Sequence, residues 1–385
     1  MQLLCLLSPA LGLAHDHLAV RLFYNAQVKT WDVVIIGGGI IGLSLSIALR
    51  KRGATVLIVE RGEPGREASH AAGGMLVDCP LETPDALQPL ATASARMYPE
   101  FAYELEIESG IKVDLRDFGT IVFLSAEHAE QHAQFAASHS LPVPLNEFEP
   151  ELASADTAAM YLKERSVDPR ALSAAALKAA KNRGVDFATG DPVESIALSN
   201  GKVSGVHRAK IGYQASKVVN CAGAWSGQIS CGGKASLHPT RPVKGQMLCL
   251  AMPARDLLKH VVRTPEVYLI PRTDGRLLVG ATVEEAGFDK RTDPDTIQRF
   301  HRAALKLVPK LSEAKILEDW AGLRPGTPDG LPILGTTDIP GYYVATGHFR
   351  DGILLAPITA EVMAQIISDE KPAYDLSSFS PCRFL

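Results

Sequence analysis

The stretch "WDVVIIGGGIIGLSLSIALRKRGATVLIVERG" (31–62) decides the fold of this chain. Residues 32–36 are a continuous apolar run, as a strand buried on both faces requires. The apolar-periodic segment 40–52 predicts a helix, and Gly53 is a typical helix stop. Residues 55–59 predict a second buried strand. The order strand, helix, strand indicates the first unit of an α/β fold.

Three glycines between the first strand and the helix indicate a ligand. Gly37, Gly39 and Gly42 have the spacing G-x-G-x-x-G. In this pattern the first glycine makes a tight turn, the second lets a pyrophosphate approach the backbone, and the third lets helix and strand pack closely. The helix N-terminus then offers free N–H groups to phosphates, and Glu60 can accept hydrogen bonds from ribose hydroxyls. The pattern predicts dinucleotide binding; the alternative is a glycine-rich turn without a ligand.

The segment "REASHAAGGML" (66–76) bears on which dinucleotide is bound. Its small residues would let a large flat group lie against the backbone. A nicotinamide enzyme would usually continue into a further βαβ unit, whereas this chain enters a loop and then helical sequence around 85–109. An ordinary Ala/Gly loop is the alternative interpretation.

Composition excludes several classes of protein. The chain has 385 residues, 46% apolar and 21% charged, with a formal charge of −4, so neither nucleic acid nor an anionic membrane surface is an expected partner. No apolar run approaches the roughly 18 residues of a membrane span. The six cysteines show no CxxC spacing, which argues against a zinc site or a disulfide framework and favours a cytoplasmic protein.

The N-terminal stretch "MQLLCLLSPALGLAHDH" (1–17) weakly resembles a secretory signal. It lacks the Lys or Arg that normally begins a signal peptide. We expect 1–30 to be a disordered extension or the product of an upstream start codon, with a signal peptide as the alternative.

Six segments together resemble the glycine oxidase/D-amino-acid oxidase family of flavoproteins, in particular its thiamine-biosynthesis branch. The segments are "VVIIGGGIIG" (33–42), "AAGGML" (71–76), "RPVKGQML" (241–248), "VYLIPR" (267–272), "WAGLRPGTPDGLPILG" (320–335) and "GHFRDGILLAP" (347–357). The resemblance implies an α/β (α+β) protein that holds FAD without a covalent bond. It also implies a Rossmann-type FAD domain and a substrate domain whose largely antiparallel sheet covers the flavin.

The expected domains are interleaved along the chain. After the extension 1–30, the discontinuous FAD-binding domain takes 31–84, 165–235 and 325–370, and the substrate domain takes 85–164 and 236–324.

The substrate residues that the resemblance implies centre on Arg324. This arginine lies in the Gly/Pro-rich stretch 321–335, which predicts a stiff, irregular loop. A guanidinium is a planar fork that matches a carboxylate, so Arg324 is expected to clamp the carboxylate of an amino acid. Tyr268 would add a hydroxyl to the same carboxylate, Arg350 would lie where substrate meets flavin, and Val283 would line the substrate pocket. The alternatives are solvated arginines and a packing tyrosine.

The cofactor residues that the resemblance implies are Gly37, Gly39, Ile40, Ile41, Gly42, Glu60, Arg61, Ala68, Ser69, Gly73, Gly74, Met75, Val193, His348, Phe349, Arg350, Asp351, Gly352, Ile353 and Leu354. The closing helix is expected to begin near Gly352–Ile353, where its N-terminal dipole would stabilise negative charge on the flavin. Asp351 departs from the asparagine expected at this position, and we expect its carboxylate to cap the helix.

The implied reaction is the oxidation of glycine, and of sarcosine or small D-amino acids, by hydride transfer to flavin N5. The products would be a 2-oxo acid (glyoxylate from glycine), ammonia and H2O2, with thiazole synthesis for thiamine as the destination. Hydride transfer needs a neutral amine and correct placement rather than a strong protein base. His70 and His348, the only histidines in these segments, have no evident orienting partner. A small amino acid and O2 are the expected partners, and a homo-oligomer, up to a tetramer, is expected.

Three alternatives stay open. A sarcosine-oxidase-like enzyme would commonly tie FAD to a cysteine, but 250–381 contains none. A D-amino-acid dehydrogenase would pass electrons to a quinone instead of O2. A non-enzymatic FAD-binding subunit would not react with amino acids at all.

Overall fold

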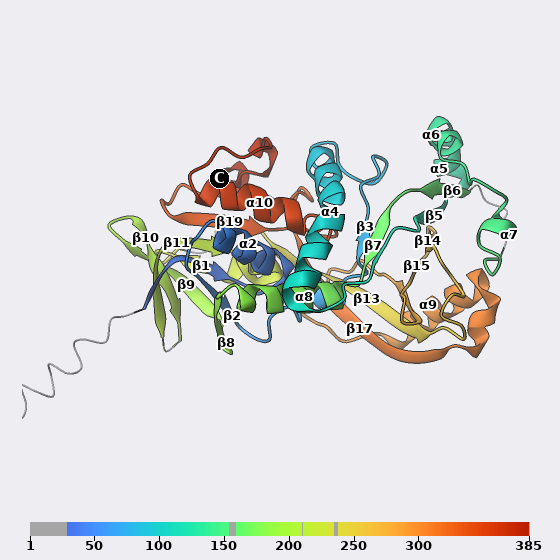
Figure 1. Cartoon of the computed structure of the whole chain (residues 1–385), viewed down its shortest axis with the longest axis horizontal. Coiled ribbons are helices and arrows are strands. Elements are labelled where there is room, and N and C mark those ends of the chain that lie inside the picture. Colours follow the sequence, from blue (N-terminus) through green and yellow to red (C-terminus); the bar gives the residue numbers. More distant parts are fainter. Residues whose placement is uncertain (1–28, 154–158, 210, 235–237, 385) are drawn as a thin grey trace, which may run out of the picture. The chain divides into compact units, whose positions relative to one another are not determined.

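The computed structural model describes residues 29–153, 159–209, 211–234 and 238–384. Most of the predicted N-terminal extension, 1–28, lies outside the described residues. From Trp31 onward the chain forms one compact unit that contains two large sheets (Figure 1).

The first sheet has nine strands in the order β12-β9-β10-β11-β1-β2-β8, with β19 paired to β11 and β18 paired to β19. Parallel pairing joins β1 to β2, β2 to β8 and β11 to β19. The bounds are β1 Thr30–Ile36, β2 Val56–Glu60, β8 Asp186–Thr189, β9 Val193–Ser199, β10 Lys202–Arg208, β11 Gly212–Asn220, β12 Ser230–Cys231, β18 Ile333–Thr336 and β19 Tyr342–Thr346. Asn200 and Gly201 connect β9 to β10 with positive φ at both residues, which is the predicted hairpin turn.

Four helices pack beside the first sheet (Figure 1). They are α2 Ile40–Lys51, α4 Gln88–Ser109, α8 Pro169–Asn182 and α10 Ala356–Ile367. Their apolar faces share one core with the sheet; Leu43, Tyr98 and Leu172 are fully buried in it. Asp168 begins α8 as predicted, because its carboxylate accepts the backbone N–H of Arg170 at 2.8 Å.

The second sheet has seven strands in the order β17-β13-β16-β15-β14-β5-β6. All its pairings are antiparallel except that of β14 with β5. The bounds are β5 Thr120–Phe123, β6 Ala159–Leu162, β13 Arg241–Ala251, β14 Val261–Arg263, β15 Tyr268–Pro271, β16 Arg276–Gly280 and β17 Lys315–Gly326. Helix α9 (Pro294–Leu307) buries Ile297 and Phe300 in the core of this sheet. The predicted fold class is confirmed.

The smaller elements connect these layers. A three-stranded sheet joins β3 Met75–Leu76, β7 Arg165–Val167 and β4 Leu115–Arg116. The short helices are α3 Ala68–Ala71, α5 Ala126–Gln131, α6 Ala133–Ser138, α7 Leu145–Phe148, η1 Gly223–Gln228, η2 Pro309–Glu313, η3 Ser377–Phe379 and η4 Pro381–Phe384.

Two local predictions are wrong. Arg324 does not lie in an irregular loop, because β17 runs through Gly326 and pairs Arg324 with Val243 of β13. Helix α10 begins at Ala356 rather than near Gly352–Ile353, since residues 352–355 form turns that precede it.

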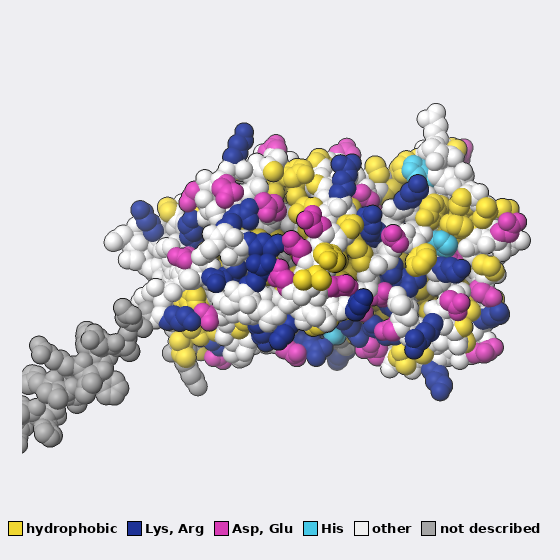
Figure 2. Space-filling view, viewed as in Figure 1, with side chains coloured by type: hydrophobic (Ala, Val, Ile, Leu, Met, Phe, Trp, Pro, Cys, Tyr) yellow, Lys and Arg dark blue, Asp and Glu magenta, His cyan; other side chains and the backbone are white. Residues whose placement is uncertain are grey.

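Lys/Arg and Asp/Glu side chains are interspersed over the face in Figure 2, as the small net charge suggests. None of the helices in the described ranges is long and apolar enough to cross a membrane.

Candidate active site

A cavity of about 1230 Å³ is lined by residues of both large sheets. It brings together most of the residues expected from the sequence: Gly37, Gly39, Ile40, Ile41, Glu60, Arg61, Ala68, Ser69, Gly73, Gly74, Met75, Val193, Tyr268, Val283, Arg324, His348, Phe349, Arg350, Asp351, Gly352 and Ile353. Gly42 and Leu354 do not line it.

The glycine turn after β1 has no room for a side chain at Gly37 or at Gly42. A Cβ on Gly37 would lie 2.5 Å from the carbonyl oxygen of Cys221, and Gly37 has φ 103°. A Cβ on Gly42 would lie 2.1 Å from the oxygen of Gly37. The backbone is therefore exposed to the cavity at Gly37, while Gly42 lets α2 approach β1.

Two polar side chains hold this turn. Glu60 accepts the N–H of Gly38 at 2.8 Å and that of Gly62 at 2.9 Å. The N–H of Ile40, at the start of α2, donates to the Ser69 hydroxyl at 2.9 Å. One of the N–H groups expected to be free for phosphate is thus already satisfied within the protein, and Glu60 braces the turn.

Trp225 was not expected at the site. The Arg61 guanidinium lies 3.4 Å from the centre of its ring, and Phe288 packs on the ring with 5.3 Å between centroids. Arg61 also forms an ion pair with Glu67. The only sequence signal was an aromatic residue within the Ala/Gly turn "AGAWS" (222–226).

On the second sheet, Tyr268 faces the cavity from β15. It is paired with Gly280 on β16, which in turn is paired with Met247 on β13. The Tyr268 hydroxyl donates to the Met247 sulfur at 3.3 Å. Burial raises the pKa of Tyr268, and the nearby positive charge of Arg324 opposes the rise, so the hydroxyl stays a donor at neutral pH.

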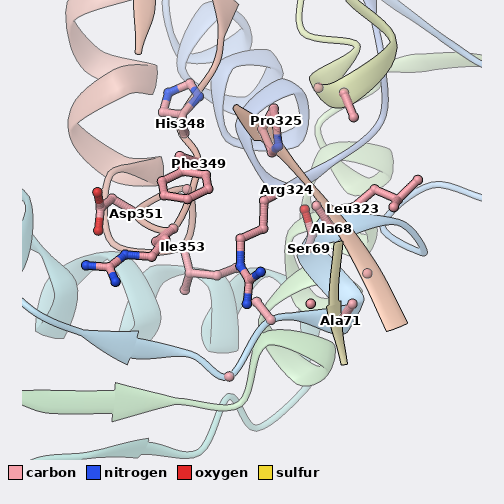
Figure 3. A pocket seen from close by; sticks show the side chains of 18 of the residues that line it. Ala68, Ser69, Ala71, Leu323, Arg324, Pro325, His348, Phe349, Asp351 and Ile353 are labelled. Carbon is pink, nitrogen blue, oxygen red and sulfur yellow. The ribbon is translucent and has the colours of Figure 1, made fainter. Parts of the chain in front are cut away.

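Arg324 reaches the cavity from β17 (Figure 3). Its Nη1 donates to the carbonyl oxygens of Thr282 at 3.1 Å and Lys244 at 3.4 Å. A Cβ on Gly245 would lie 2.3 Å from the same nitrogen, so this glycine makes room for the guanidinium. Burial lowers the pKa of Arg324, but an arginine stays charged in a protein. The geometry leaves a fixed cation with spare donors, which can pair with a carboxylate.

A second arginine beside Tyr268 was missed. Arg263 on β14 is the cross-strand partner of Tyr268 and lines the same cavity. Its guanidinium pairs with Glu82 at 2.8 Å and with Glu164 at 2.9 Å. Burial raises the pKa of Glu164 to about 7, although Arg263 opposes this. The sequence feature that could have identified Arg263 is a charged residue at the end of the buried strand 261–263.

The turn before α10 forms another wall (Figure 3). Tyr98 and Ser94 of α4 hold this turn by donating to the carbonyls of Ile353 at 2.5 Å and Leu354 at 2.6 Å. In the described chain, the N–H groups of Gly352 and Ile353 make no hydrogen bond. They are donors available to a ligand.

The predicted capping role of Asp351 is wrong. Leu355 is the N-cap of α10 and no side chain caps the helix. The Asp351 carboxyl is instead desolvated, which raises its pKa to about 6 against the opposing charge of Arg350. His348 donates to or accepts from Thr359 at 3.1 Å, and burial lowers its pKa to about 3, so its ring is neutral.

Val283 lines the cavity but is 63% exposed, which places it at an open part of the wall. Glycines without room for a Cβ and unsatisfied backbone N–H groups lie in the same cavity as Arg324. These features fit a long cofactor with a diphosphate and a flat ring. They define a class of protein, namely one that holds a dinucleotide beside a carboxylate-binding pocket.

Comparisons with known proteins identify the family. The DAO family, FAD dependent oxidoreductase, matches residues 32–366. The chain therefore belongs to this family, and its cofactor is FAD. The chain is 33% identical to a glycine oxidase of Pseudomonas aeruginosa, over 91% of this chain and 98% of that protein. The crystal structure of glycine oxidase from Geobacillus kaustophilus superposes with a TM-score of 0.85 at 33% identity, covering 92% of this chain and 99% of that one.

A third relative is longer. The bifunctional protein ThiO/ThiG of Trichormus variabilis is 35% identical over 92% of this chain but only 55% of its own length. The chain thus spans about half the length of the bifunctional relatives that it matches.

Proposed function

We propose that this protein is an amino acid oxidase of the glycine oxidase type. It would convert a small amino acid, O2 and water to a 2-oxo acid, an amine and H2O2, with glycine as the first candidate and sarcosine and small D-amino acids as others. The amine would be ammonia from a primary amino acid and methylamine from sarcosine. The observation that carries the proposal is the Arg324 guanidinium, fixed by two carbonyls in the cavity that holds the glycine turn. The likeness to glycine oxidases supports it.

In this proposal Arg324 binds the substrate carboxylate through its free N–H groups. The Tyr268 hydroxyl gives up its hydrogen bond to the Met247 sulfur and donates to the same carboxylate. Arg350 lines the same cavity and adds positive charge near Arg324. Bound FAD supplies the two-electron acceptor. His348 is neutral and bonded to Thr359, so the proposal gives it no role as a base. The substrate amine would lose its proton to solvent before it reacts.

The likeness to ThiO/ThiG proteins supports a further part of the proposal, namely that the product serves thiazole synthesis in thiamine biosynthesis. In the described chain, Cys221 is the only cysteine that lines the cavity, and burial raises the pKa of its thiol. We therefore propose that FAD is held without a covalent bond, so that denaturation releases it.

Mixing the oxidised protein with glycine, sarcosine or D-alanine without oxygen tests the reaction. Loss of the flavin absorbance, followed under air by one H2O2 per amino acid consumed, is expected. Bleaching without H2O2 under air would point to a dehydrogenase. No bleaching by any of the three would overturn the proposal.

A further inference from the structure

Arg272 is a fully buried charged side chain close to the cavity. It follows β15 and closes the β15–β16 hairpin, where its N–H donates to the carbonyl of Arg276 at 2.8 Å. Its relative exposure is 0%, the lowest possible value. Burying a guanidinium is costly unless its charge and its N–H groups have partners.

The guanidinium has one hydrogen-bond acceptor in the described chain. Its Nη2 donates to the carbonyl of Gly73, while Nε and Nη1 make no hydrogen bond to any described residue. Asp168 and Asp114 act on it only as nearby negative charges. The direct contact of Arg272 is therefore with the segment 66–76.

This contact fixes the direction of a peptide group. The Gly73 carbonyl and the Gly74 N–H belong to the same planar trans peptide, so they point in opposite directions. With the carbonyl turned into the protein toward Arg272, the N–H of Gly74 points the other way. No hydrogen bond from this N–H is found within the described ranges, and both glycines line the cavity.

The surrounding packing keeps the peptide in this orientation. The carbonyl of Gly74 is also turned away, because it accepts the N–H of Val167 at 2.8 Å. A Cβ on Gly73 would lie 2.8 Å from the Ile270 side chain, and Gly74 has φ 76°. Glycine is needed at both positions for the segment to lie this close to β15 and β7.

We propose that Arg272 is a positioning residue that directs the Gly74 N–H into the FAD cavity as a hydrogen-bond donor to the cofactor. Its charge also polarises the peptide, which strengthens the donor. A stronger donor favours the electron-rich form of the cofactor, so Arg272 raises the reduction potential of bound FAD. The proposal concerns FAD alone and does not depend on which amino acid is oxidised.

Variants of the hairpin arginines provide the first test. Arg272→Met removes the donor, Arg272→Lys keeps a positive charge, and Arg276→Met is the matched control. Arg276 lies in the same hairpin and pairs with Asp168 and Asp274, but within the described ranges it makes no hydrogen bond or ion pair with 66–76. Thermal melting of each holoprotein shows whether it is folded.

The readout is the midpoint potential of bound FAD during dithionite titration. Arg272→Met is expected to lower the two-electron equilibrium constant about tenfold, which corresponds to about 30 mV. Arg272→Lys should lower it less, and Arg276→Met should leave it unchanged. An unchanged potential in Arg272→Met, or an equal shift in Arg276→Met, would overturn the proposal.

A second test observes the Gly73–Gly74 peptide of the unmodified protein directly and uses a variant only to assign its signal. When glycine alone carries ¹³C at the carbonyl and ¹⁵N, only Gly–Gly peptides give a coupled amide signal. The sequence contains four: 37–38, 38–39, 73–74 and 232–233. The 73–74 signal, identified by its loss in Gly73→Ala, should move when dithionite reduces the holoprotein, whereas the 232–233 signal should not. A 73–74 signal that does not move would contradict the proposal.

Discussion

The two sides of the cavity are built in opposite ways. The backbone side, the glycine turn 37–42 together with 66–76, presents peptide groups to the cavity and has no room for a Cβ at Gly37, Gly42, Gly73 and Gly74. The side-chain side, carried by the second sheet, presents Tyr268, Arg324 and Arg263 from three strands. Peptide groups can bind phosphates and a flat ring in any protein that has the turn, whereas charged side chains select the substrate. Changes on the first side should therefore remove FAD, and changes on the second should alter substrate kinetics with FAD in place.

The largest effect is expected for Gly42→Ala. Its methyl group would lie 2.1 Å from the oxygen of Gly37, so α2 must move away from β1 and the turn must open. We expect FAD affinity to fall by more than a hundredfold, measured by fluorescence titration of the apoprotein.

Gly190→Ala is the matched control. Gly190 has φ 100° but no atom within 4 Å of its missing Cβ, so alanine there introduces backbone strain without a collision. If both variants lost FAD equally, general destabilisation rather than the close packing of the turn would be the cause.

Arg324→Met should have the next largest effect, and it should weaken substrate binding without changing FAD binding. Losing one partner of a desolvated charge pair costs about 2–5 kcal/mol, which is roughly a factor of 30 to several thousand in affinity. KM for glycine should rise by that factor while FAD content stays constant.

Arg241→Met serves as the comparison for Arg324→Met. Arg241 lies on β13, which pairs with β17, and forms an ion pair with Glu285 outside the cavity lining. The KM for glycine of Arg241→Met should equal that of the unmodified protein. Loss of FAD from Arg324→Met would mean that Arg324 supports the fold instead of the substrate.

The same contrast explains what the sequence could predict. The backbone side is local: strand, glycine turn, helix and Glu60 follow one another within 31–62, so a spacing pattern predicts them. The side-chain side depends on pairings between distant segments. The glycines and prolines around Arg324 indicated a loop, yet pairing with β13 draws them into a strand. Arg263 acquires its place beside Tyr268 only through the β14–β15 register.

Two other contacts could not be predicted from any sequence pattern. Trp225 contacts Arg61 although the two residues are far apart in the sequence. The role of Gly245 is visible only once β17 lies beside β13 and the Arg324 side chain occupies the space above that glycine. Spacing along one segment carries no information about either contact.

Gly245→Ala should produce a smaller effect than Arg324→Met. The added methyl group would lie 2.3 Å from Nη1 of Arg324, and overpacking of this kind costs about 1–3 kcal/mol. We expect KM for glycine to rise roughly tenfold. In the Arg324→Met background the same change should have no further effect on KM, because the side chain it displaces is gone. If the two changes instead raised KM independently and additively, Gly245 would not act by making room for the Arg324 side chain.

Asp351→Asn changes the turn before α10, which forms another wall of the cavity. Its effect on the FAD midpoint potential and on stability should be the smallest of these and should depend on pH. Because burial raises the pKa of Asp351 to about 6, its carboxyl is ionised at pH 8 and mostly protonated at pH 5. The carboxylate opposes negative charge on reduced FAD, so the variant should have the higher midpoint potential at pH 8, and the difference should shrink by pH 5.

The folded protein holds the Asp351 proton more tightly than the unfolded chain does, so ionisation costs stability as the pH rises from about 4 through 6. The variant should accordingly gain melting temperature over the unmodified protein at pH 8, gain less at pH 5, and gain nothing at pH 3, below the unfolded pKa. Asp369→Asn, an exposed change beyond the end of α10, should shift neither quantity. A potential difference that stayed constant across this pH range would show that the Asp351 charge does not reach the cofactor.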